Sequence, residues 1–187
     1  GENESQQVIA LAPVEKGGHG LDALWNDDFH HSALVALTGR RDGYFTDYRG
    51  EAQEFISAVK RGFLYQGQHY LWQKKPRGSQ VTAEPAAAFV HYIQNHDQVA
   101  NHLRGERLHV LTNPARVRAM TALLLLAPET PLLFMGQEFG ASSPFLFFAD
   151  HQGELDAGRR YCYQDEQQAE RDERWDQHRL SAKTVGH

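Results

Sequence analysis

The stretch FVHYIQNHDQVAN, residues 89–101, decides how the rest of the sequence is interpreted. Its first half is rich in β-branched and aromatic residues, which favour a strand. The apolar run then ends in an amide, an imidazole and a carboxylate at Asn95, His96 and Asp97. Polar groups directly after a buried strand are typical of parallel α/β folds, in which functional residues gather beyond the carboxyl ends of strands.

A second segment of the same kind follows. Residues 131–140, PLLFMGQEFG, are predicted to form a short buried strand that ends at residues 136–138. Between the two strands, Asn113 is an expected N-cap and Pro114 an expected first helical residue, so a helix is predicted that ends before Pro128. The order strand, helix, strand predicts an α/β fold with a parallel sheet.

The first half of the chain also contains helical patterns. Residues 21–39 contain an aromatic and acidic cluster and then a helix, with Asp27 or Asp28 as the expected N-cap and Gly39 as the expected end. A second helix is expected within residues 48–65, because apolar residues recur there at spacings of three and four. The other segments are expected to form a short strand or helix start at residues 8–13 and a polar loop at residues 73–85.

The composition is that of a globular domain. Of 187 residues, 41% are hydrophobic and 23% are charged, and the net charge of −5 comes from interspersed acidic and basic residues. Neither a nucleic-acid nor a membrane partner is therefore expected. The longest apolar run, residues 122–128, is too short to span a bilayer. Cys162 is the single cysteine, which fits a cytoplasmic location and excludes a disulfide framework.

Carboxylates at strand ends favour acid–base or nucleophilic chemistry. Sugar hydrolysis commonly needs two carboxyl groups, and aromatic residues that can stack on sugar rings are available in this chain. On composition alone, however, such carboxylates are more often solvated surface groups. A metal site is the other alternative, but His30 and His31 are adjacent and cannot easily bind one ion, so no metal or other cofactor is expected.

Several motifs, taken together, resemble one known family. They are WNDDFHH (25–31), NHDQVAN (95–101), GQEF (136–139) and SPFLFFADH (143–151). The sequence from residue 1 to about residue 155 resembles the malto-oligosyltrehalose trehalohydrolases, a branch of the α-amylase superfamily of retaining glycosidases. The resemblance implies a (β/α)8 barrel, of which this chain carries the C-terminal half, strands five to eight, in a domain over residues 1–155. Residues 156–187 depart from the family pattern and are expected to form a charged tail.

The resemblance also implies roles for individual residues. Glu2 matches the general acid/base, with a pKa raised by burial and neighbouring carboxylates, and Asp97 matches the third carboxylate, which supports the distorted sugar ring. His96 matches a histidine that hydrogen-bonds a sugar hydroxyl. Further substrate-binding or supporting positions are Asn95, Gln98, Trp25, Asp27, Asp28, Phe29 and His30. Glu138 is expected to brace the barrel mouth.

The nucleophilic aspartate of the family, at the end of the fourth strand, has no counterpart in this sequence. The chain is therefore expected to be a fragment that lacks the N-terminal half of the barrel and a C-terminal β domain. The complete enzyme would cleave the α-1,4 bond next to the trehalose end of maltooligosyltrehalose and release trehalose, whereas the isolated chain is expected to be inactive. Two alternatives remain: a branching enzyme or glucanotransferase of the same superfamily, and a non-catalytic glycan-binding remnant.

Overall fold

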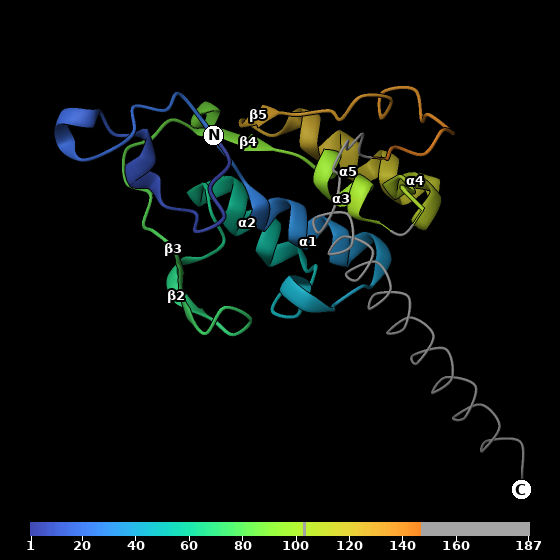
Figure 1. The fold of residues 1–187 in the computed structure, drawn as a ribbon, viewed down its shortest axis with the longest axis horizontal. Helices are drawn as coiled ribbons and strands as arrows, with labels where there is room; N and C mark the ends of the chain where they lie inside the picture. The colour runs from blue at the N-terminus through green and yellow to red at the C-terminus, as the bar shows by residue number, and fades with distance from the viewer. Residues whose placement is uncertain (103, 147–187) are drawn as a thin grey trace, which may run out of the picture.

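The computed structural model describes residues 1–102 and 104–146 (Figure 1). The tail expected over residues 156–187 lies outside the described residues, as does Cys162. None of the helices in the described part of the chain combines the length and the apolar character needed to cross a bilayer.

Three parallel strands form the central sheet. They are β1 (Leu24–Trp25), β4 (Phe89–His91) and β5 (Thr130–Pro131), in the order β1-β4-β5. The helices that connect them pack beside the sheet, so the predicted α/β architecture with parallel strands is confirmed (Figure 1). Of the strand predicted over residues 131–140, only Pro131 belongs to β5. Residues 132–134 have no regular secondary structure, and turns follow from residue 135.

The N-terminus extends the sheet beyond β1. The amide of Trp25 donates to the carbonyl of Gly1 at 3.0 Å, and the amino group of Gly1 donates to the carbonyl of Ala23 at 2.7 Å. Gly1 therefore lies beside β1 on the side opposite β4. As a result, Glu2 directly follows a strand-like position, as Asn26 and Asp27 follow β1.

Helix α1 (Asp27–Thr38) connects the sheet to the rest of the core. Its N-cap is Asn26, whose side chain accepts from the amide of Phe29 at 3.1 Å, so the prediction that Asp27 or Asp28 caps the helix was wrong. Both aspartates lie in the first turn, where a negative charge interacts favourably with the helix dipole. Gly39 ends the helix with a φ of 77°, as predicted.

Helix α2 (Ala52–Arg61) confirms the predicted helix in residues 48–65. Phe55 is buried on it, but Ile56 is 46% exposed and does not belong to the buried face. The helix ends at Gly62, whose φ is 77° and whose Cα faces the ring of Phe89 so closely that a Cβ would lie 2.6 Å from it. Glycine is thus required there by both conformation and space.

Between residues 96 and 126, the structure describes three further helices. They are α3 (His96–Asn101), α4 (Leu108–Leu111) and α5 (Pro114–Leu126), and Asn113 caps α5 by accepting from the amide of Ala115 at 2.8 Å. The cap and the proline at the first helical position were both predicted. Single 3₁₀ turns complete the description: η1 (Val8–Leu11), η2 (Val14–Lys16), η3 (Gly43–Phe45) and η4 (Ala86–Ala88). Of the two alternatives expected for residues 8–13, a strand or the start of a helix, the structure shows no strand but a single 3₁₀ turn over Val8–Leu11.

A β-hairpin was missed in the sequence. Strands β2 (Gln66–Tyr70) and β3 (Lys75–Gly78) pair antiparallel, although residues 73–85 had been expected to form a polar loop. The pattern gave no signal because the exposed faces of both strands carry Gln, His and Lys. In the view of Figure 1 the hairpin lies at the lower left, with α1 and α2 between it and the sheet.

One buried ion pair joins the hairpin to α1. The Nε atom of Arg77, on β3, lies 3.0 Å from Oδ1 of Asp28, and both side chains are at most 1% exposed. The same carboxylate accepts from the hydroxyl of Tyr48 at 2.7 Å and from the amides of Leu64 and Tyr65 at 3.0 and 2.9 Å. Four donors therefore satisfy Asp28, which is the condition for a stable buried charge.

The described residues contain two clusters of buried apolar side chains. The larger lies between α1, α2 and the segment after β4, and the smaller lies under β1 and β4. Each fully buried Phe or Leu side chain contributes about 1.5–3 kcal/mol of transfer free energy. The fully buried members at the centre of the two clusters are Phe29, Tyr48, Ile93 and Leu124 in the larger one and Leu24 and Phe63 in the smaller one.

The substitution Asp28→Asn should destabilise the chain strongly. It keeps the size of the side chain but removes the carboxylate that bonds Nε of Arg77, and the remaining counter-charge, Asp27, lies 3.8 Å from Nη2 and beyond hydrogen-bond range. The loss of one partner of a buried ion pair typically costs about 3–5 kcal/mol. Urea denaturation gives the free energy of unfolding. The matched control is Asp42→Asn, which breaks the exposed Arg40–Asp42 pair and should cost less than about 1 kcal/mol. Equal losses in the two variants would contradict the structural role of Asp28.

Acidification should weaken the fold through His30. Burial lowers the pKa of His30 from 6.5 to about 4, although its hydrogen bond with the carbonyl of Ile93 raises it. Between these pH values the unfolded chain binds a proton that the folded chain excludes, so the free energy of unfolding falls as the pH drops from about 6.5 to about 4. Between pH 7 and 5, His30→Asn should reduce this loss by about 2 kcal/mol. Urea denaturation at both pH values measures the free energy of unfolding. The control is His69→Asn, on the exposed face of β2, which should lose as much stability between pH 7 and pH 5 as the wild type does.

Candidate functional site

A pocket of about 350 Å³ opens where the strands of the sheet end. Its lining comes from three adjacent positions: Glu2 follows Gly1, Trp25 and Asp27 lie at and after the end of β1, and Asn95 and Asp97 follow β4. The carboxyl ends of parallel strands meet at one edge of a sheet, which is why residues far apart in the sequence share this pocket.

Three polar side chains converge at this edge. One ligand atom each from Glu2, His96 and Asp97 lie within 4.8 Å of one another. The Nε2 atom of His96 is 3.5 Å from Oδ1 of Asp97. His96 and Asp97 are half-buried and Glu2 is exposed, so the burial expected for Glu2 is not found. Two carboxyl groups and an imidazole thus face the same small volume, and together they provide proton donors, proton acceptors and negative charge.

The backbone that carries His96 and Asp97 is fixed by a capping box. The Asn95 side chain caps α3 and accepts from the amide of Asp97 at 2.8 Å, while the Gln98 side chain accepts from the amide of Asn95 at 3.2 Å. The two residues line the pocket, and their side chains also fix the start of α3. This supporting role explains why an amide precedes the histidine and the aspartate.

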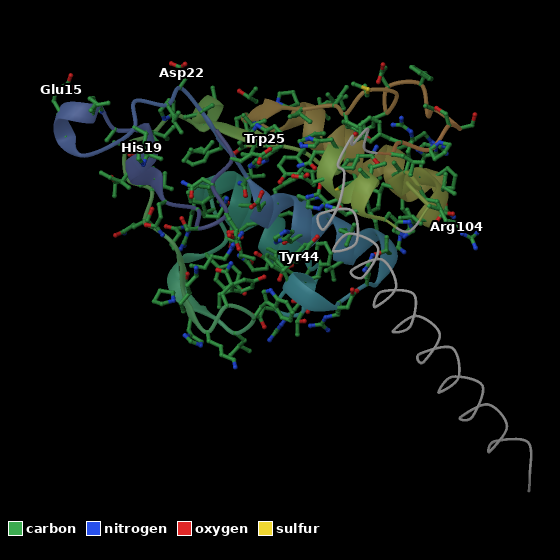
Figure 2. All side chains as sticks on the ribbon, in the orientation of Figure 1. Glu15, His19, Asp22, Trp25, Tyr44 and Arg104 are labelled. Atoms are coloured by element: carbon green, nitrogen blue, oxygen red, sulfur yellow. The ribbon has the colours of Figure 1, made fainter. Side chains whose placement is uncertain are left out.

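Aromatic side chains form part of the pocket wall. Trp25 is labelled near the middle of the molecule in Figure 2 and packs against Tyr92, with ring centroids 5.5 Å apart, and against His96 at 6.1 Å. Tyr44 and Trp72 also line the pocket, and Trp72 is 54% exposed. Exposed rings of this kind provide apolar faces on which a sugar ring can stack.

Asp27 is the pocket carboxyl with a perturbed acidity. Burial raises its pKa from 3.8 to about 6, the hydrogen bond from Tyr92 and the charge of Arg77 lower it, and Asp28 and Glu2 raise it. Tyr92 donates its hydroxyl to Oδ1, and Nη2 of Arg77 lies 3.8 Å from Oδ2. Asp27 is therefore a carboxyl group whose pKa is raised to about 6 and whose side chain, 22% exposed, is open to the pocket.

Three expected substrate-binding residues do not line this pocket. Asp28 is bound to Arg77, Phe29 is fully buried in the core, and His30 is fully buried, with its Nδ1 atom 3.0 Å from the carbonyl of Ile93. Their burial fits a supporting position, and a substrate-binding role for them stays a prediction. All three belong to α1, which is buried on nearly every face because it lies between the sheet and α2.

Glu138 is exposed and does not line the pocket. Its neighbour Gln137 accepts from the side chain of Gln94 at 3.3 Å, and Gln94 accepts from the amide of Leu108 at 3.0 Å. Support for this end of the sheet therefore comes from Gln137, and the bracing role expected for Glu138 stays a prediction.

Sequence reasoning missed several residues of the pocket, and Arg77 and Tyr92 are the two that contact Asp27. Arg77 stands in a run of lysines and glutamines that looks solvated, and no local pattern distinguishes it from its neighbours. Tyr92 looks like an ordinary strand residue, although its hydroxyl reaches Asp27. The sequence signal that could have identified Tyr92 is its position three residues before the polar cluster that begins at Asn95.

The triad of Glu2, His96 and Asp97 consists of residue types that also bind cations. Among the described residues, this is the group of three whose ligand atoms lie within 4.8 Å of one another. Asp27, Asp28, His30 and His31 are not part of the group. The rings of His30 and His31 lie 5.5 Å apart, in an edge-to-face arrangement. The expectation of a site without metal stays a prediction.

The sequence was compared with known proteins, and no family model matches it. Curated relatives do match, and each is named malto-oligosyltrehalose trehalohydrolase. The relative from Deinococcus radiodurans is 47% identical over 137 residues, which are 72% of this chain and 23% of the relative. The relative from Saccharolobus solfataricus is 39% identical over 149 residues, which are 80% of this chain and 26% of the relative. The relative from Mycobacterium tuberculosis is 36% identical over 137 residues, which are 72% of this chain and 23% of the relative.

A solved structure matches as well. A crystal structure of a Salmonella typhimurium protein assigned as an alpha amylase superposes with a TM-score of 0.77 at 38% sequence identity. The matched region covers 88% of this chain and 29% of the Salmonella typhimurium chain. The resemblance to the malto-oligosyltrehalose trehalohydrolases is thus confirmed, and the shared fold relates this chain to the α-amylase family. The chain spans about a quarter of the length of the curated relatives it matches.

The substitution Tyr92→Phe should raise the pKa of Asp27 above its value of about 6, because the hydroxyl of Tyr92 stabilises the ionised carboxylate. An NMR titration of the side-chain carboxyl carbon of Asp27 measures the shift. Tyr65→Phe is the matched control, since its hydroxyl bonds the carbonyl of Asp47 instead. An unchanged or lower pKa in the Tyr92 variant would show that this hydrogen bond does not govern Asp27.

Proposed function

We propose that this chain is part of a retaining glycoside hydrolase of the α-amylase family, one that cleaves maltooligosyltrehalose next to its trehalose end. The observation that carries the proposal is the convergence of Glu2, His96 and Asp97 within 4.8 Å at the carboxyl edge of a parallel sheet. The names of the curated relatives support the choice of substrate.

Each group has a distinct role in this reaction. Glu2 protonates the glycosidic oxygen as the bond to the anomeric carbon breaks, and it then takes a proton from the water that releases the sugar. Asp97 holds sugar hydroxyls and stabilises the positive charge that develops on the ring. His96 hydrogen-bonds a neighbouring hydroxyl, and Trp25 supplies an aromatic face next to it.

A retaining mechanism needs a carboxylate nucleophile, and we propose that it lies outside this sequence. Gly1, β1, β4 and β5 lie side by side in the order expected for the last four strands of a (β/α)8 barrel. In the complete protein, the first half of the barrel would bring an aspartate to the opposite side of the same sugar. A C-terminal β domain completes the proposed protein.

Water would resolve the glycosyl–enzyme intermediate in a hydrolase, whereas a sugar hydroxyl would resolve it in a branching enzyme of the same family. The three carboxyl groups Glu2, Asp27 and Asp97 are compatible with either acceptor and do not distinguish the two reactions. The choice of hydrolysis is supported by the names of the relatives. A glycan-binding role without catalysis needs only the pocket and its aromatic wall. Activity measurements on a complete barrel separate these possibilities.

A chimaera provides the test. Residues 1–146 of this chain replace the corresponding part of the Deinococcus radiodurans relative, and trehalose release from maltooligosyltrehalose is measured. The chimaera should be active, and Glu2→Gln should lower its turnover about 10²–10⁴-fold because the proton donor is lost. The 187-residue chain alone should release no trehalose.

The control is Glu15→Gln, an exposed glutamate at the end of the molecule remote from Trp25 (Figure 2). It should leave turnover unchanged. Normal turnover in the Glu2 variant would remove Glu2 from the mechanism. New α-1,6 branches as the main product would assign the chain to the branching enzymes, and trehalose release by the isolated chain would refute the proposal that the nucleophile lies elsewhere.

A further inference from the structure

Gln6 has a backbone conformation that its residue type rarely adopts. Its φ is 55°, in the left-handed region that favours glycine, and its side chain is fully buried. Backbone strain of this kind persists only where the surrounding structure enforces it, and it gathers at active sites. Gln6 follows Glu2 by four residues, so the strain lies in the segment that carries the proposed acid/base.

The side-chain amide of Gln6 joins this segment to the end of β1. Its Nε2 atom donates to the carbonyl of Asn3 at 2.8 Å and to the carbonyl of Trp25 at 3.1 Å. The backbone amide of Gln6 donates to the same carbonyl of Asn3 at 2.9 Å, which closes a turn over residues 3–6. The reversed orientation of the side-chain amide would place its oxygen against two carbonyl oxygens, so the donor role of Nε2 is defined.

The burial of this amide is only partly compensated. The Oε1 atom of Gln6 has no hydrogen-bond partner among the described residues. A buried polar atom without a partner lowers the free energy of unfolding, and a methionine of similar size would avoid that loss. Stability alone therefore does not explain a glutamine at this position, whereas the two hydrogen bonds from Nε2 do.

Both neighbours of Glu2 are attached to the backbone of Trp25, which is labelled in Figure 2 and lines the pocket. On one side, the amide of Trp25 donates to the carbonyl of Gly1 at 3.0 Å. On the other side, Gln6 links the carbonyl of Asn3 to the carbonyl of Trp25. Glu2 thus stands between two attachments to a single residue of β1, and these attachments fix its backbone relative to the pocket wall.

We propose that Gln6 is a positioning residue for the acid/base, an inference that rests on the proposed function. Gln6 holds the turn over residues 3–6 against the end of β1 and thereby keeps the carboxyl group of Glu2 directed at the same volume as His96 and Asp97. Gln6 is fully buried and does not belong to the pocket lining that the described residues form, so it acts on the reaction through Glu2. A displacement of about 1 Å in a reacting group can lower the rate about 10²-fold.

The first test is Gln6→Met, which keeps the length of the side chain but has no donor. In the chimaera described above, it should lower kcat for maltooligosyltrehalose about 10²-fold and leave KM nearly unchanged, because a misplaced proton donor slows bond cleavage and not binding. Gln6→Gly removes the backbone strain together with the amide, and it should lower kcat in the same way. The matched control is Gln53→Met on α2, which makes the same change at an exposed position and should leave turnover unchanged.

A double variant distinguishes positioning from a general effect on the fold. Residues that act as a unit have non-additive effects, so Gln6→Met should cause no further loss of turnover when Glu2→Gln is already present. Normal kcat in the two Gln6 variants overturns the inference. A loss in the Glu2→Gln background as large as the loss in the unsubstituted chimaera overturns it as well, because Gln6 would then act independently of Glu2.

Hydrogen exchange in the 187-residue chain tests the same contact without any activity. In Gln6→Met the amide of Trp25 should exchange about tenfold faster, the size expected when two hydrogen bonds that hold its acceptor segment are lost. The amide of Asn26 donates to the carbonyl of Val90 at 2.8 Å and is the internal reference, which should keep its wild-type rate. Unchanged exchange at Trp25, or equally faster exchange at both amides, overturns the inference.

The two measurements separate this inference from the proposed function. An active chimaera with normal kcat in the Gln6 variants overturns the positioning role of Gln6 alone. An inactive chimaera refutes the proposed function, and the exchange rate of the Trp25 amide then decides whether Gln6 holds the turn.

Discussion

The buried pair of Asp28 and Arg77 is the constraint on which the arrangement of the pocket depends. A charge inside a protein is tolerated only when a partner and hydrogen bonds compensate its lost hydration. Asp28 meets this condition with Arg77, Tyr48 and two amides, so the first turn of α1, the hairpin and the segment after α2 have to meet at one point. Arg77 then reaches the carbonyl of Glu4, and the N-terminal segment is held beside β1.

The pocket is built from short peptide segments on this frame. Glu2, Asp27 and Asp97 follow neighbouring strand positions, and their side chains are brought together by the parallel sheet and by the caps at Asn26 and Asn95. Each cap uses an asparagine that accepts from the first turn of the following helix. The same local device therefore fixes two of the three segments that carry the proposed chemistry, while hydrogen bonds between Gly1 and β1 fix the third.

Local patterns predicted elements well where backbone preferences are strong and short in range. Asn113 with Pro114 predicted the start of α5, and Gly39 predicted the end of α1. The hairpin escaped prediction because most of its residues are polar, and Arg77 could not be recognised as buried within it. Phe29 and His30 were expected at the site because they stand next to Asp27 in the sequence, but successive residues of a helix point in different directions, and theirs is toward the core.

The sequence by itself determined the α/β order of elements, the polar clusters after the strands and the resemblance to a glycosidase family, because each of these depends on residues close together in the chain or on matching motifs. Only the tertiary structure decided which side chains share the pocket. It separated the accessible Asp27 from its neighbour Asp28, which is fully buried, and it brought Arg77 next to both. The physical reason is that burial and charge pairing depend on contacts between distant segments, about which local patterns carry no information.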